Sequence, residues 1–204
     1  MVWSTLTGEE TPITAPKTDL DLSLYDWSRD GRSLLTSQLN QDSRHYEIWT
    51  VDVDAAQAAR KITSASDYNL WQGHFSPDGR WILFLATRSK GVESTIFLMP
   101  AAGGTWIPVT DGKQWDDKPR WSPDGKTIYF VSGRNGFFNV YGARFDSGKG
   151  KPVGLPFRVT DFRSTAAMIP QAIIPVELGI SPDRLVVNVT QISGNIWVLD
   201  HAER

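Results

Sequence analysis

The sequence contains no cysteine and only three histidines among its 204 residues. Without cysteine the chain can form neither a disulfide nor a thiolate metal site, which fits the cytoplasm and equally fits a periplasmic protein without disulfides. The 21 lysines and arginines nearly balance the 23 aspartates and glutamates, and no basic run occurs. This charge pattern argues against nucleic acid and against anionic membrane surfaces as partners.

Long apolar runs are absent as well. No stretch is long enough to span a bilayer, and the first residues lack the basic and apolar regions of a signal peptide. We therefore expect no insertion into a membrane. A cytoplasmic location is expected if Met1 is the native start, whereas a signal sequence removed ahead of Met1 would leave no trace.

Catalytic motifs are also missing. The sequence has no serine in a G-x-S-x-G pattern, no H-E-x-x-H pattern and no Walker A loop. We expect the chain by itself not to be an enzyme, and we expect it to need no cofactor and no metal ion.

What the sequence does contain is one phrase that occurs four times. Its best form is Ser-Pro-Asp-Gly followed by a basic residue, at 76–80 and 122–126; a copy without proline lies at 28–32, and one without glycine at 181–184. Serine and proline suit the first two corners of a type I turn, aspartate can bond the local backbone, and glycine tolerates the positive φ of the exit. An aromatic or apolar residue precedes each copy and an apolar run follows, so each phrase predicts a β-hairpin. We expect the two incomplete copies to form less rigid turns.

The repeat extends beyond this hairpin. The aspartates Asp30, Asp78, Asp124 and Asp183 are about 48, 46 and 59 residues apart. Alternating segments that could form third strands lie at 46–52, 94–99, 139–143 and 195–200, and candidate fourth strands lie at 60–63, 106–110 and 157–160. Four short strands in a unit of about 45 residues are typical of a propeller blade. The predicted fold is an all-β propeller of four-stranded antiparallel blades, about four to the chain.

We expect a single propeller domain over 1–204. Its predicted parts are a partial blade at 1–15, full blades at 20–63, 68–110 and 116–160, an insertion at 163–175 and a last blade at 176–200 without its own fourth strand. Residues Thr11 to Ala15 could supply that strand and close a four-bladed ring. Alternatively, two chains could form one eight-bladed ring as a homodimer, or the chain could be part of a longer propeller. We favour the last two arrangements, because Val2 to Leu6 duplicates a strand that the C-terminal segment already provides.

The phrases at Phe75 to Arg80 and Asp117 to Lys126 resemble the WD40-like PD40 repeat of TolB-type β-propellers. The resemblance covers most of the chain outside Arg163 to Pro175. It implies a bacterial propeller that binds a protein or peptide at its faces or channel, and it favours a periplasmic location. Related propellers are attached to kinases, transcriptional regulators and prolyl-oligopeptidase-type peptidases. The α/β domain and the signal sequence of TolB have no counterpart here.

Candidate binding residues flank or occupy the predicted first strands, which line the channel of a propeller. They are Tyr68, Trp71, Gln72, His74, Trp115, Asp116, Asp117 and Arg120. His74 could face a ligand or bond between blades, and we favour the structural role. The aspartates could bind a cation or a basic peptide at the channel mouth, but we favour hydrogen bonds within their own turns.

Three functions remain open at this point. We favour a non-enzymatic scaffold that binds a protein or peptide, because the repeats carry no catalytic constellation. The alternatives are an accessory or regulatory propeller of a longer enzyme or regulator chain, and a propeller that binds a carbohydrate or small molecule near Gln72 and His74.

Overall fold

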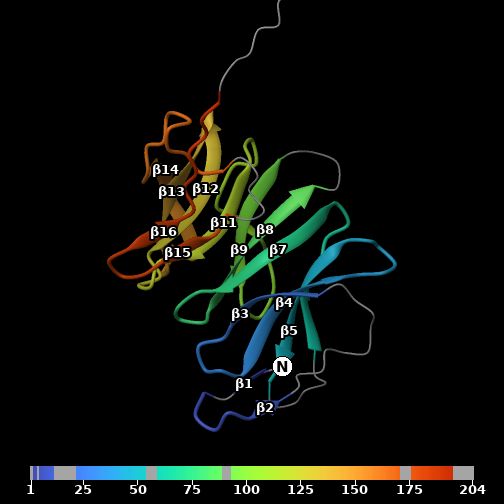
Figure 1. Cartoon of the computed structure of the whole chain (residues 1–204). Coiled ribbons are helices and arrows are strands. Elements are labelled where there is room, and N and C mark those ends of the chain that lie inside the picture. The colour runs from blue at the N-terminus through green and yellow to red at the C-terminus, as the bar shows by residue number, and fades with distance from the viewer. Residues whose placement is uncertain are drawn as a thin grey trace, which may run out of the picture.

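The structure is a computed structural model that describes residues 2–3, 5–11, 22–53, 59–88, 93–170 and 176–194. Every regular element within these ranges is a β-strand, and the strands form separate sheets that follow one another along the chain (Figure 1). No helix that could cross a membrane is found in the described ranges. The predicted all-β class is confirmed.

Three of the sheets have four antiparallel strands in chain order, as expected for propeller blades. The first blade consists of β3 (Leu22–Trp27), β4 (Ser33–Leu39), β5 (Tyr46–Asp52) and β6 (Ala59–Thr63). The second consists of β7 (Tyr68–Phe75), β8 (Trp81–Arg88), β9 (Ser94–Pro100) and β10 (Ile107–Pro108). The third consists of β11 (Asp116–Trp121), β12 (Thr127–Asn135), β13 (Phe137–Asp146) and β14 (Lys151–Arg158).

Two smaller sheets complete the described elements. They are the pair β1 (Val2–Trp3) and β2 (Glu10–Thr11), and the pair β15 (Leu178–Ile180) and β16 (Leu185–Val187). The candidate third strand at 195–200 and most of the candidate closing strand at 11–15 lie outside the described residues. In the segment 163–175, the described part forms two isolated bridges, Ser164 to Ala167 and Met168 to Thr190.

The repeated phrase forms the turn that the sequence predicts. The Ser76 hydroxyl donates to a carboxylate oxygen of Asp78 at 2.6 Å and accepts the Trp81 amide at 3.0 Å. The Gly79 amide donates to the Ser76 carbonyl at 2.8 Å, and Gly79 has a φ of +70°. The same serine–aspartate bond recurs in the other three copies, between Ser28 and Asp30, Ser122 and Asp124, and Ser181 and Asp183. Serine and aspartate therefore close the turn even in the copies that lack proline or glycine.

The hydrophobic core lies between the blades, because successive sheets pack face to face. Phe84 in β8 and Phe130 in β12 occupy one repeat position, and both are completely buried. Phe84 belongs to a cluster with Leu35 and Ile48 of the first blade, and Phe130 to a cluster that joins the second and third blades. The blades are thus held together by interdigitating apolar side chains.

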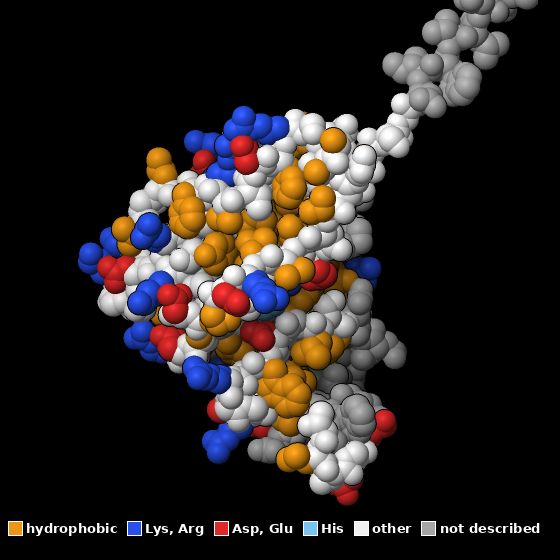
Figure 2. Space-filling model, turned by 60° about the vertical axis from the view of Figure 1, so that its left-hand side comes forward, with side chains coloured by type: hydrophobic (Ala, Val, Ile, Leu, Met, Phe, Trp, Pro, Cys, Tyr) orange, Lys and Arg blue, Asp and Glu red, His pale blue; other side chains and the backbone are white. Residues whose placement is uncertain are grey.

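The described sheets form an open row. The pair β1–β2 lies beside the first blade, at the opposite end of the row from β15–β16 (Figure 1). Apolar side chains remain accessible in the first blade and in the last strand pair, with Leu24 58% exposed and Val186 67% exposed. Elsewhere on the surface, side chains of both charges are interspersed with accessible apolar ones (Figure 2). The described sheets do not close into a ring, and most of the two segments predicted to close one, 11–15 and 195–200, lies outside the described residues.

One strand differs clearly from its expected range. β14 begins at Lys151, well before the expected start at Phe157. The pairing of β13 with β14 shifts register between Gly142 and Arg144, and Gly154 has a φ of +73°. A bulged strand loses the simple alternation of inward and outward side chains, which hid its first half in the sequence.

Candidate functional site

The first strands of the three blades each contain a bulge. The register shifts between Leu24 and Asp26 in β3, between Trp71 and His74 in β7, and between Asp117 and Arg120 in β11. Within the last two bulges, Gln72 has a φ of +52° and Lys118 a φ of +53°, which is the left-handed region that residues other than glycine rarely adopt. Strained residues of this kind are concentrated at functional sites, because the surrounding structure must hold them in place.

The two strained residues contact one another across the interface between blades. The Gln72 carboxamide donates to the Asp117 carboxylate at 2.9 Å, and its oxygen accepts the Lys118 backbone amide at 3.0 Å. The Asp117 carboxylate also accepts the indole N–H of Trp115 at 3.1 Å. These bonds fix both bulges and orient the Trp115 ring.

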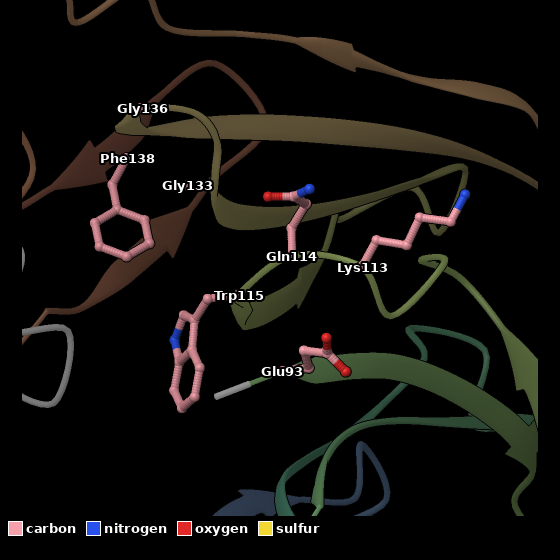
Figure 3. Close-up of a pocket in the computed structure, with 7 residues that line it drawn as sticks. All are labelled: Glu93, Lys113, Gln114, Trp115, Gly133, Gly136 and Phe138. Carbon is pink, nitrogen blue, oxygen red and sulfur yellow. The ribbon is translucent and has the colours of Figure 1, made fainter. Parts of the chain in front are cut away.

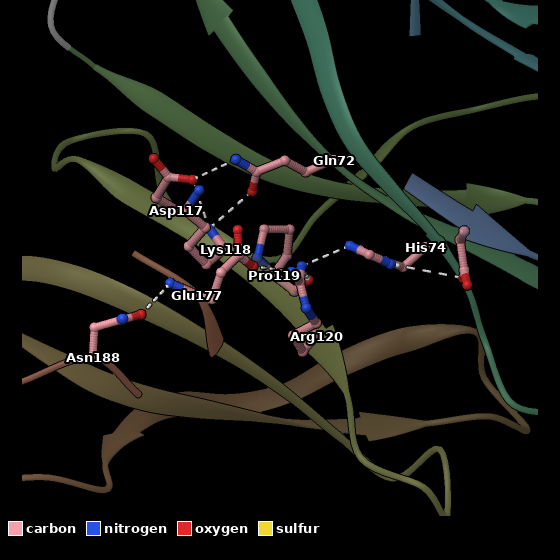
Figure 4. A network of polar contacts seen from close by, with 9 residues as sticks. Gln72, His74, Asp117, Lys118, Pro119, Arg120, Glu177 and Asn188 are labelled. Carbon is pink, nitrogen blue, oxygen red and sulfur yellow. Dashed lines mark hydrogen bonds and ion pairs between the residues drawn. The ribbon is translucent and has the colours of Figure 1, made fainter. Parts of the chain in front are cut away.

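A row of polar and charged side chains crosses the first strands, two residues further along the repeat than Gln72 and Lys118 (Figure 4). Nε2 of His74 lies 2.6 Å from Nη1 of Arg120, and its Nδ1 lies 3.7 Å from an Asp26 oxygen. Nη2 of Arg120 lies 3.3 Å from a carboxylate oxygen of Glu177. The row thus joins side chains from β3, β7 and β11 to the segment before β15.

The contacts of His74 define its tautomer. A guanidinium has only donors, so Nε2 of His74 must accept from Arg120. The ring proton then sits on Nδ1, which faces Asp26, and the imidazole is neutral. Burial, reinforced by the nearby Arg120 charge, lowers the pKa of His74 below its ordinary value of 6.5, although Asp26 acts in the opposite direction.

The pKa values of Asp26 and Arg120, which lie on either side of His74 in the row, are also shifted. Burial, the largest single influence on Asp26, raises its pKa, but the facing His74 ring and the amides of Trp27 and Phe75 lower it overall. Burial also lowers the pKa of Arg120, against the effect of Glu177 and two aspartates. Because an arginine keeps its charge at any physiological pH, Arg120 remains a cation.

These side chains surround a cavity of about 460 Å³, which we call the channel cavity. It is lined by Leu24, Tyr25, Gln72, His74, Trp115, Asp117, Lys118, Arg120 and Glu177. Its wall combines two aromatic side chains with cations, carboxylates and a carboxamide. Such a wall can bind polar backbone groups and charged ends of a ligand, while the aromatic rings pack on its apolar parts.

Five of the eight candidate residues from the sequence line this cavity, namely Gln72, His74, Trp115, Asp117 and Arg120. His74 both bonds between blades and faces the cavity, so the two roles weighed for it are compatible. The ligand-binding role of the eight residues stays a prediction.

The other three candidates lie elsewhere. Tyr68 packs edge-on against Trp106 with ring centroids 6.2 Å apart. Trp71 lies over Tyr46 at 3.9 Å and donates its indole N–H to Thr87 at 3.0 Å. Asp116 is completely buried and forms an ion pair with Arg134 at 3.0 Å. Among the described residues, no group of three His, Asp or Glu side chains could hold a metal ion.

Sequence reasoning missed Leu24, Tyr25, Lys118 and Glu177. The sequence did contain a signal for Leu24, Lys118 and Glu177. Together with Gln72 they keep the spacing of the repeated aspartates, so the four residues occupy one repeat position. Asp26, His74 and Arg120 occupy another such position. Aligning the four copies beyond the turn would have selected both sets.

Acidification is expected to destabilise the protein through His74. Its pKa is lowered in the folded state, so between that value and 6.5 the unfolded chain binds the proton and the folded chain does not. Stability then rises with pH through this window and levels off above it, with a slope of at most about 1.4 kcal/mol per pH unit for one proton. Asp26 has a lowered pKa too, so its contribution is lost only at lower pH, below its ordinary value of 3.8.

Urea denaturation at several pH values between about 7 and 5 tests this window. The variant His74→Gln keeps an acceptor for Arg120 and a donor toward Asp26 but cannot take up the proton. Its stability should change less with pH than that of the wild type. Equal slopes in the two proteins would show that the His74 pKa is not lowered.

Comparison with known proteins gave a family match over most of the chain. The model of the TolB β-propeller domain, PD40, matches residues 22–171. An uncharacterised protein of Agrobacterium fabrum is 34% identical over 108 residues, which cover 53% of this chain and 35% of that protein. Dipeptidyl-peptidase 5 of Porphyromonas gingivalis is 25% identical over 154 residues, covering 69% of this chain and 22% of that protein. This chain therefore matches only about a third or less of these relatives' length.

Among solved structures, puromycin hydrolase superimposes with a TM-score of 0.63 at 16% identity. The match covers 88% of this chain and 30% of that one. At this identity the similarity supports the propeller fold alone, and it carries no information on substrates.

Proposed function

Because the chain belongs to the TolB β-propeller (PD40) family, we propose that it is a non-catalytic scaffold that binds an extended peptide segment in the channel cavity. The observation that carries this proposal is the pair of strained bulges, in which Gln72 and Lys118 adopt positive φ angles at the cavity wall. A left-handed conformation costs about 1–3 kcal/mol per residue, and such strain is retained where it positions groups for a ligand.

The arrangement of charges supports a peptide as the ligand. Arg120 has 23% of its side chain exposed, and its outward nitrogen contacts Glu177, whose side chain is 72% exposed. An exposed ion pair of this kind contributes little, about 0–1 kcal/mol, so a carboxylate of the ligand can replace Glu177 at small cost. The Gln72 carboxamide has two N–H donors and uses one of them for Asp117, so the second can donate to a backbone carbonyl of an extended segment.

Selection of random 12-residue peptides by display on the intact chain tests the proposal. We expect enriched peptides to carry a carboxylate and to bind Arg120→Gln at least about tenfold more weakly than wild type, equivalent to about 1.4 kcal/mol. Arg32→Gln is the matched control, because Arg32 is exposed beside the first repeated turn and is not among the residues of the cavity wall. Calorimetry gives the affinities, and mass spectrometry of the recovered peptide reports any cleavage.

Two results would contradict this function. One is a selection that enriches no peptide whose binding depends on Arg120. The other is hydrolysis of bound peptide by the purified chain, which would contradict the non-catalytic assignment.

A second candidate function is favoured by the peptidase relative, of which this chain matches 22%. In this proposal the propeller is an accessory module that binds peptides for a peptidase domain of a longer polypeptide. The two proposals share the channel cavity and differ in the size of the native protein. An immunoblot of the source cells distinguishes them, because an accessory module would migrate well above the 22.8 kDa of this sequence.

A further inference from the structure

A second cavity lies beside the hairpin between β12 and β13, outside the channel cavity. It has a volume of about 500 Å³ and is lined by Glu93, Lys113, Gln114, Trp115, Gly133, Gly136 and Phe138. The rings of Trp115 and Phe138 lie on one side of the cavity, and Gln114, Lys113 and Glu93 lie on the other side (Figure 3). We call this cavity the aromatic cleft. Only Trp115 is shared with the channel cavity.

The two rings are held rigidly by the protein. Both pack against the core cluster that contains Val131 and Val140, so each ring keeps one side for the cleft. The Trp115 indole N–H already donates to Asp117 at 3.1 Å, which fixes the ring and leaves an apolar surface toward a ligand. Binding therefore costs little side-chain ordering, which is the main benefit of a preorganised site.

Glycine makes the geometry of the cleft attainable. A Cβ atom at Gly133 would lie 3.1 Å from the Phe138 ring, so only glycine lets the ring rest on the backbone here without displacement. The Gly133 amide donates to the Trp115 carbonyl at 3.2 Å, and Gly136 has a φ of +87° at the hairpin tip. The hairpin that carries Phe138 is thus bonded to the residue that carries the other ring.

The rim of the cleft is polar but has no net charge. Glu93 and Lys113 carry opposite charges, and Lys113 is 78% exposed, with Asp111 at 3.8 Å as its ion-pair partner. The Gln114 carboxamide makes no hydrogen bond with any described part of the chain, so its donors and acceptor are available to a ligand. A neutral apolar slot with one free carboxamide favours an uncharged ligand that presents a flat apolar group beside a carbonyl.

We propose that the aromatic cleft binds a proline-bearing, extended peptide segment. A proline ring is rigid and packs on aromatic faces, and a polyproline helix keeps its backbone carbonyls free for a donor such as Gln114. Aromatic-lined grooves recognise such segments because the ligand loses little conformational entropy on binding. The inference is independent of the peptide proposed for the channel cavity, since it rests on different side chains.

A titration followed by ¹⁵N–¹H NMR tests the proposal on the full chain. The probe is a terminally blocked decapeptide of proline, and a blocked glycine–serine peptide of the same length is the control ligand. We expect the proline peptide to shift the Trp115 indole resonance and the Gly133 and Gly136 amides, and the control peptide to leave them unchanged. A Trp115→Phe variant assigns the indole resonance.

Two variants of one hairpin make the test specific. Phe138→Leu keeps an apolar side chain on the core but removes the aromatic wall, and it should weaken binding of the proline peptide at least about fivefold. Phe137→Leu is the matched control, because Phe137 is the adjacent residue and does not line the cleft; its affinity should equal that of wild type. Arg120→Gln should bind the proline peptide normally, which separates this inference from the channel-cavity proposal.

The proposal is overturned if millimolar proline peptide shifts none of these resonances, or if Phe138→Leu binds it as tightly as wild type. It is also overturned if a neutral oligosaccharide such as maltotriose shifts them while the proline peptide does not. That outcome would identify the cleft as a sugar site.

Discussion

Replacement of Phe84 by alanine is expected to destabilise the protein by about 3–5 kcal/mol, the cost typical of removing a fully buried aromatic ring. Phe84 is completely buried in the middle of β8. Its ring lies edge-on to Trp106 with centroids 5.0 Å apart and stacks on Phe97 at 6.0 Å. The same cluster includes Leu35 and Ile48 of the first blade, so the cavity left by alanine would open at the interface between two blades.

Urea denaturation measures the expected loss, with Leu155→Ala as the control. Leu155 is 90% exposed, and its truncation should change the free energy of unfolding by no more than about 0.5 kcal/mol. Hydrogen exchange should show faster opening of β4 and β5 in Phe84→Ala, because these strands lose a packing partner from the second blade. A cost below about 1.5 kcal/mol would mean that the neighbouring rings can fill the space, contrary to the close packing described here.

The sequence predicted the fold well because each blade carries its own turn signal. Serine and aspartate at fixed positions form the same side-chain hydrogen bond to one another in all four copies. The apolar runs at Trp81 to Leu85 and Thr127 to Val131 are strands. Local chemistry determines these hairpins, so no long-range information was needed. How the ends of the row are covered depends on contacts between segments far apart, and local patterns do not encode it.

The candidate site was only partly predictable, and the bulges are the reason. In a regular strand, alternate residues point to opposite faces, so Trp71 and its neighbours could have been assigned to the channel or to the core. An extra residue in the strand reverses this alternation. The bulge after Trp71 leaves Trp71 against Tyr46 and directs Gln72 and His74 to the cavity.

Asp116 and Asp117 illustrate the same limit. They are adjacent in sequence and are the same residue type, but Asp117 lines the channel cavity, whereas Asp116 is completely buried and pairs with Arg134 of β12. The pairing with Arg134 depends on the register of β11 against β12. A count of charges near the channel mouth could not distinguish the carboxylate that lines the cavity from the one that is buried.

Replacement of Arg134 by methionine is expected to lower the free energy of unfolding by about 3–5 kcal/mol. Nη2 of Arg134 lies 3.0 Å from Asp116, whose side chain is completely buried, and the guanidinium also lies over the Tyr141 ring at 4.7 Å. Methionine retains much of the apolar stem but leaves the Asp116 carboxylate without a counter-charge. An unpaired buried charge costs far more than the ion pair itself contributes.

A double-mutant cycle separates the charge from the packing. Asp116→Asn removes the stranded charge, so Arg134→Met should cost much less when it is combined with Asp116→Asn than in the wild type, with a coupling of at least about 1 kcal/mol. Arg144→Met is the matched control, because Arg144 is exposed and its guanidinium lies over the Phe157 ring at 5.9 Å with no buried carboxylate as its partner among the described contacts. That change should stay within about 0.5 kcal/mol. If Arg134→Met cost no more than Arg144→Met, Asp116 would have to be satisfied by groups other than Arg134, and the ion pair would not anchor β11 to β12.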